Sequence, residues 1–165
     1  MAAARPIPGL TAEDPYATAA AKILAVRARE VADQSRDVLD VSDIERVHDM
    51  RVATRRLRAA LEIFEPCFPK KQFKSTLRDV KAIADALGER RDRDVAIAAL
   101  EEFAAALPAA DRPGIASLIE QLRVEQTEAN GNLAPFVDPT RLAALSERLA
   151  DLVVHAEAAA RPGAE

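Results

Sequence analysis

Cationic side chains recur in one short stretch, residues 48–58, with the sequence HDMRVATRRLR. On a helix that turns by about 100° per residue, its positive or ionisable members gather on one face, and they are His48, Arg51, Arg55 and Arg58. Arg56 falls at the flank, and the apolar residues fall on the opposite side. Arginine stays charged at any accessible pH, and its planar guanidinium can grip two phosphate oxygens. Because closely spaced arginines repel one another, this face predicts a polyanionic partner with phosphate groups.

A second and weaker basic face follows along the chain. Lys74, Arg78 and Lys81 are spaced i, i+4, i+7, which places them on one side of a helix. Asp85 would lie on the same side and partly neutralise it. We expect the two basic faces, on helices at residues 43–64 and 70–87, to form one surface.

A charged segment, ERRDRDV, comes directly after Gly88. The glycine predicts the end of one helix, and Asp92 predicts the start of the next, with a turn over residues 88–94. A helix N-terminus offers unpaired N–H groups and a positive dipole end, which suit a phosphate, and Arg91 would add a guanidinium. We expect Asp92 and Asp94 to act in support, as first-turn residues that orient Arg91.

The charge of the chain is unevenly distributed. Its formal net charge is −4, yet residues 46–93 hold 13 of the 23 Lys and Arg and 7 of the 27 Asp and Glu. The middle of an acidic protein is therefore strongly basic, which again indicates a polyanionic partner.

The elements that must position these residues are helices. Aromatic residues make up only 4% of the chain, so an aliphatic core is expected. Apolar residues recur at helical spacing, and no segment alternates as a strand does. We predict an all-α antiparallel bundle of about six helices, at about residues 14–39, 43–64, 70–87, 92–107, 111–131 and 138–160. Residues 1–13 are expected to be a flexible N-terminus, residues 14–160 the bundle and residues 161–165 a frayed tail.

Cysteine content and hydropathy predict the cellular compartment of the protein. The single Cys67 excludes an internal disulfide framework, and no run of apolar residues approaches the length of a membrane span. No signal peptide is apparent at the N-terminus, so we expect a cytoplasmic protein. We expect no metal site and no cofactor.

The two motifs together resemble the CHAD family, the conserved histidine α-helical domains. They read His48-x-x-Arg51-Val52-x-x-Arg55-Arg56-Leu57-Arg58 and Leu87-Gly88-x-x-Arg91-Asp92-x-Asp94-Val95. The resemblance implies an all-helical protein that binds inorganic polyphosphate through a basic surface or channel. We expect this binding to involve no catalysis. It also implies association with polyphosphate granules. The polyphosphate-binding residues would be His48, Arg51, Arg55, Arg56, Arg58, Lys74, Arg78, Lys81 and Arg91.

The chain departs from that family in one respect. A typical CHAD domain resembles a pair of similar helical halves, each with its own basic helix. In this chain, no second His-x-x-Arg run follows residue 93. The sequence therefore resembles one half of the domain with extra helices. A homodimer would supply the second half and would place two arginine rows face to face.

Other functions stay open from the sequence. A helical scaffold for an acidic protein would also use an arginine row. A nucleic-acid-binding module is less well supported, because aromatic side chains that could stack on bases are missing near the row. An enzyme acting on phosphoanhydrides would need a P-loop or a cluster of metal-binding carboxylates, and the sequence shows neither.

Overall fold

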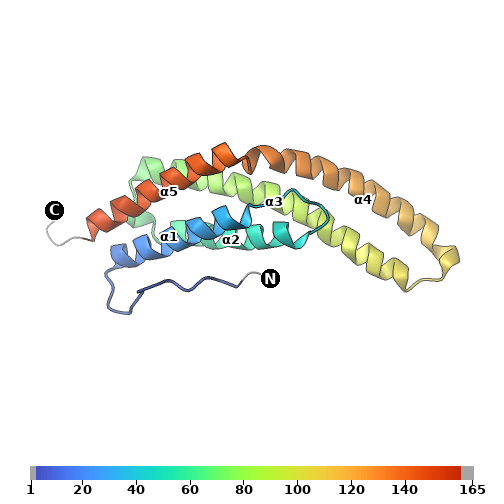
Figure 1. The fold of residues 1–165 in the computed structure, drawn as a ribbon, viewed down its shortest axis with the longest axis horizontal. Coiled ribbons are helices and arrows are strands. Elements are labelled where there is room, and N and C mark those ends of the chain that lie inside the picture. Colours follow the sequence, from blue (N-terminus) through green and yellow to red (C-terminus); the bar gives the residue numbers. More distant parts are fainter. Residues whose placement is uncertain (1–2, 161–165) are drawn as a thin grey trace.

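The computed structural model of the chain describes residues 3–160, and these form an all-helical structure (Figure 1). The five α-helices are α1 (Tyr16–Gln34), α2 (Glu45–Ile63), α3 (Lys70–Ala105), α4 (Arg112–Leu133) and α5 (Pro139–Ala159). Short 3₁₀ turns precede α3, α4 and α5, at Glu65–Cys67, Ala109–Asp111 and Ala134–Phe136. The predicted bundle is confirmed, with five helices in the described residues in place of six. The frayed tail expected at residues 161–165 lies outside the described part of the chain, as do residues 1–2.

The body of the bundle consists of α1, α2, α5 and the first part of α3. Helix α1 packs between α2 and α5, and α3 packs against α2, α4 and α5. The core is aliphatic, and its fully buried side chains include Leu24, Met50, Leu57, Leu87 and Leu152. This core fixes which faces of α2 and α3 are left to solvent.

The second part of α3 and most of α4 extend beyond the body as a helical hairpin (Figure 1). We call residues 95–126 of this hairpin the arm. Four large apolar side chains of the arm are exposed, namely Val95, Phe103, Leu118 and Val124. A hairpin of two helices can bury only the sides that face each other, which explains this exposure.

Local capping explains where some helices begin. The Asp138 side chain accepts hydrogen bonds from the backbone N–H groups of Thr140 and Arg141, and Pro139 occupies the first turn of α5. This is the predicted start of that helix. Ser42 does not cap α2, since its hydroxyl donates to the Asp40 carboxylate and α2 begins at Glu45 without a side-chain cap on Ile44.

Two predicted helix ends differ from the structure. Helix α1 ends at Gln34, and residues 35–39 form turns in which Asp37 has a φ of 53°. Helix α4 continues past Gly131 to Leu133, whose side chain is fully buried. A residue that reaches the core extends a helix past a glycine when burial outweighs the glycine's low helix propensity.

The segment before α1 lies along that helix. The Arg5 N–H donates to Glu30, whose side chain is buried, and Lys22 Nζ lies 2.8 Å from the Asp14 carboxylate. This hydrogen bond from Lys22, with one from the Thr11 backbone, holds the pKa of Asp14 below its ordinary value. These contacts hold residues 5–14 against α1. The predicted basic residues lie on other helices, α2 and α3.

Candidate functional site

The arginine row of α2 is exposed along one side of the helix. Arg51 and Arg55 are both exposed, and neither forms an ion pair with any residue between 3 and 160. The opposite side of the same turns carries Met50, Leu57 and Leu61, all fully buried. The apolar side therefore anchors α2 in the core and directs the two arginines to solvent.

The basic side of α3 adjoins this row. The Glu62 carboxylate lies 3.0 Å from Arg58 Nε on its own helix and 3.7 Å from Lys81 Nζ on α3. One acidic side chain thus contacts a cation from each helix, which shows that the two predicted basic faces meet. We call this surface the basic face; it comprises Arg51, Arg55, Arg58, Lys74, Arg78 and Lys81.

Along α3, the basic face includes a shallow groove. The groove has a volume of about 490 Å³ and is lined by Lys74, Leu77, Arg78, Lys81, Ala82 and Asp85. Arg78 is 78% exposed, and its nearest acid is Asp79 at 4.0 Å. Asp79 instead pairs closely with Arg148 of α5, at 2.6 Å, which leaves Arg78 available for an external anion. Asp85 lines the same groove and lowers its positive charge, as predicted from the spacing.

The remaining predicted residues of α2 lie at the margins. His48 and Arg56 are half-buried, whereas the row between them is exposed. His48 lies one turn before Arg51 and on the same side of the helix. Arg56 lies at the flank of the row.

The turn predicted over residues 88–94 is wrong, because α3 runs without interruption from Lys70 to Ala105. Gly88 lies within this helix, and a Cβ built there would meet nothing within 4 Å. Residue 92 therefore does not begin a helix, and the backbone N–H groups expected to bind phosphate there are used within α3. Asp92 is exposed in mid-helix and Asp94 is buried, so neither is the first-turn residue that was expected.

Arg91 also differs from its predicted position. Its Nη1 donates to the backbone carbonyl of Ile44, at 3.2 Å, and lies 3.4 Å from the Glu45 carboxylate. Its side chain is only 17% exposed. The structure thus places Arg91 against the start of α2 and away from the exposed groove.

Sequence reasoning missed a buried polar network beside Arg91. Arg90 is fully buried, and its Nε donates to Asp94 Oδ1 at 2.8 Å. Gln126 Nε2 of α4 donates to the same oxygen at 2.6 Å, and Arg90 Nη1 donates to Asn130 Oδ1. The spacing of Arg90 and Asp94 could have predicted their burial, because they continue the helical stripe of residues 83, 87 and 97, which is buried on α3.

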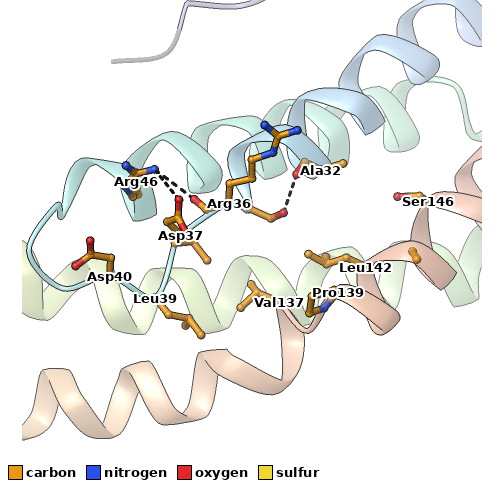
Figure 2. Close-up of a pocket in the computed structure, with 13 residues that line it drawn as sticks. Ala32, Arg36, Asp37, Leu39, Asp40, Arg46, Val137, Pro139, Leu142 and Ser146 are labelled. Carbon is orange, nitrogen blue, oxygen red and sulfur yellow. Dashed lines mark hydrogen bonds and ion pairs between the residues drawn. The ribbon is translucent and has the colours of Figure 1, made fainter.

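A more voluminous cleft than the groove lies away from the basic face. It has a volume of about 790 Å³ and lies between the turns after α1 and the start of α5 (Figure 2). Val38, Val137 and Leu142 form part of its lining, and Arg46 lies 3.8 Å from Asp37 at its edge. Its two arginines, Arg36 and Arg46, are matched by Asp37 and Asp40. This cleft therefore lacks the excess of cations found on the basic face.

Residues 3–160 contain neither a candidate metal site nor a candidate membrane-spanning helix. No group of three or more His, Cys, Asp or Glu side chains in this range is arranged to hold a metal ion. None of the helices in this range has the length and apolar character needed to cross a bilayer. The free thiol of Cys67 is partly covered, and this burial raises its pKa.

A family model described as CHAD domain matches residues 22–165. The chain belongs to the CHAD family. CHAD domains are associated with polyphosphate binding. No curated protein and no solved structure matches the chain. The basic face of this CHAD protein lies within the matched residues.

Proposed function

We propose that this CHAD protein binds inorganic polyphosphate through the basic face and does not act on it chemically. The observation that carries the proposal is the pair of exposed arginines, Arg51 and Arg55, which have no acidic partner among the described residues and adjoin a second basic helix. Uncompensated cations in a row repel one another, and a linear polyanion removes that repulsion along its whole length. Counterions released from the polyanion add to the binding free energy.

The contributions of the six residues should differ. Arg51 and Arg55 have their guanidinium groups free for two-oxygen contacts with phosphate. Arg58 and Lys81 already contact Glu62, so a phosphate must compete with that carboxylate. We therefore expect the free pair to contribute most of the affinity.

We also propose that two copies of the chain associate, so that two basic faces bind one polyphosphate chain. Each copy has a single arginine row, and the second half of a typical CHAD domain would be supplied by the partner. Val95 and Phe103 of the arm, which are 50% and 54% exposed, offer an apolar surface for this contact. Association with polyphosphate granules in the cytoplasm would follow from binding of long chains.

The decisive test is a titration of long-chain polyphosphate into the purified protein at two salt concentrations. The double variant Arg51→Glu/Arg55→Glu should lose the binding, because each two-oxygen contact contributes about 1–3 kcal/mol and the reversed charges repel phosphate. Wild-type affinity should fall steeply as salt rises. The matched control is Arg29→Glu/Arg36→Glu, which makes the same change of charge at two exposed residues on α1 and the turn after it. The control should bind nearly as tightly as wild type at the higher salt concentration.

Three results would contradict the proposal. Equal loss in both double variants would mean that only net charge matters. Equal affinity for nucleic acid of matched charge would favour a general polyanion or nucleic-acid-binding module. Release of phosphate that depends on a divalent metal ion would show catalysis.

A further inference from the structure

We propose that Arg91 is a positioning residue, which fixes the start of α2 and with it the arginine row, and that it does not contact phosphate. This inference rests on the proposed function for its meaning, but its geometry is independent of that function. Arg91 belongs to the motif at residues 87–95, from which we predicted that its side chain binds phosphate. The structure instead directs its guanidinium to the backbone of another helix.

Arg91 contacts the residue at which α2 begins. Ile44 immediately precedes α2 and has no side-chain cap. Its carbonyl accepts a hydrogen bond from Arg91 Nη1 at 3.2 Å, and the neighbouring Glu45 carboxylate lies 3.4 Å from the same nitrogen. A guanidinium has donors in a rigid plane, so contact with both groups restrains the position of the first turn of α2 relative to α3.

Arg90 holds the same segment through an intermediary. Its Nη1 donates to Asn130 Oδ1, and Asn130 Nδ2 donates to the Leu39 carbonyl at 2.9 Å. Arg90 is itself fixed by Asp94, at 2.8 Å and fully out of solvent. Two consecutive arginines of α3 therefore hold the two ends of the 39–44 segment, which leads into α2.

The direction of Arg91 separates it from the basic face. Arg91 follows Lys81 by ten residues, which is about 15 Å along a helix and about 80° around it. Lys74 and Arg78 are exposed on α3, whereas the Arg91 side chain is only 17% exposed and contacts α2. A phosphate on the exposed groove would need Arg91 to leave Ile44.

Arg91 should therefore control the distances between the cations of the basic face. Arg51 and Arg55 lie two to three turns after Ile44 on the same helix. A displacement of the first turn of α2 changes their distances to Lys81 on α3. Contacts of several cations with one linear ligand depend on those distances, so loosening Arg91 should lower affinity without removing a phosphate contact.

The test separates a lost contact from a lost position. Polyphosphate affinity is measured as a function of salt for wild type, Arg91→Gln, Arg55→Gln and Arg93→Gln. Each phosphate contact adds about 0.7–0.9 to the slope of log K against log salt. We expect Arg91→Gln to weaken binding about three- to tenfold with the wild-type slope. Arg55→Gln should reduce the slope by about one contact. Arg93→Gln is the control, at a half-buried residue that contacts Glu125 of α4 at 3.5 Å, and it should change neither quantity.

A second measurement needs no ligand. Amide hydrogen exchange of the free protein should be faster at the first turn of α2 in Arg91→Gln, and unchanged there in Arg55→Gln and Arg93→Gln. If Arg91→Gln lowers the salt slope as Arg55→Gln does, Arg91 contacts phosphate and the inference is overturned. Unchanged exchange at that turn also overturns it. If the wild-type chain binds no polyphosphate, the proposed function fails, and the exchange data still decide whether Arg91 holds α2.

Discussion

Arginine occupies three different environments on α2 and α3. Arg55 is exposed without an acidic partner in the described part of the chain, Arg91 is mostly covered and bonds to a backbone carbonyl, and Arg90 is fully buried beside Asp94. The cost of each charge differs accordingly. Water stabilises the charge of an exposed guanidinium, whereas a buried guanidinium depends on its partner to offset the loss of hydration.

At Asp94, this dependence gives a stability prediction. Asp94→Asn should lower the free energy of unfolding by about 3–5 kcal/mol, because Arg90 would remain charged and buried without its counter-ion. Urea denaturation monitored by circular dichroism measures the loss. Asp92→Asn, an exposed neighbour on the same helix, is the control and should change stability by less than about 0.5 kcal/mol.

The double variant Arg90→Met/Asp94→Leu distinguishes charge from packing. It removes both charges, so it should recover much of the stability that Asp94→Asn loses. Equal loss in the single and double variants would mean that shape at this site matters more than the unpaired charge.

At the scale of the element, α3 matters because its 36 residues connect the basic face with the arm. The first turns carry Lys74, Arg78 and Lys81, the middle carries Arg90 and Asp94, and the last turns carry the arm's exposed Phe103. A single continuous helix keeps these three sets in a fixed angular relation. A break at Gly88 would remove that relation.

Gly88 offers a test of this continuity. Gly88→Ala should raise the free energy of unfolding by about 0.5–1 kcal/mol, because alanine favours a helix interior and a Cβ at this position meets nothing within 4 Å. Thermal and urea denaturation measure the gain. Gly131→Ala on α4 has the same free space and should behave alike. A loss of stability in Gly88→Ala alone would indicate that α3 bends or ends at this residue.

These helices show how far the sequence can be interpreted. The start of α5 was predictable, since Asp138 and Pro139 cap it by local contacts alone. The continuity of α3 was not, because Gly88 is a local stop signal and the burial of Leu87 and Arg90 that overrides it depends on α2 and α4. Similarly, periodicity placed Arg51 and Arg55 on one face. It could not show that Glu62 joins that face to Lys81, because this contact spans two helices.

At the scale of the whole molecule, the exposed apolar residues that the arm carries on α3 lie on the same side of this helix as Lys81 of the basic face. Val95 lies fourteen residues after Lys81, which is about four turns of a straight helix. Phe103 lies twenty-two residues after Lys81, which is about six turns. Both apolar residues therefore fall within about 40° of Lys81 around the helix axis. A two-fold contact through Val95 and Phe103 would turn the basic face of each copy towards the partner.

The balance of forces predicts that such a dimer depends on polyphosphate. A stable interface buries about 800 Å² on each partner, and two half-exposed side chains supply only part of that area. Two basic faces brought together also repel each other. A polyanion between them reverses that repulsion, so polyphosphate and dimer formation should strengthen each other.

Light scattering of the protein with short-chain polyphosphate tests this coupling. Wild type at micromolar concentration should shift towards twice the 17.8 kDa mass of one chain when polyphosphate is added. Val95→Glu/Phe103→Glu should bind the ligand and keep the mass of one chain, because charged side chains oppose burial of the arm surface. Val154→Glu, at a residue of α5 that is 61% exposed, is a control for an added carboxylate outside the arm and should dimerise as wild type does. A doubled mass in the arm variant would show that polyphosphate merely tethers two independent copies, and a bound wild type of single mass would show that one basic face suffices.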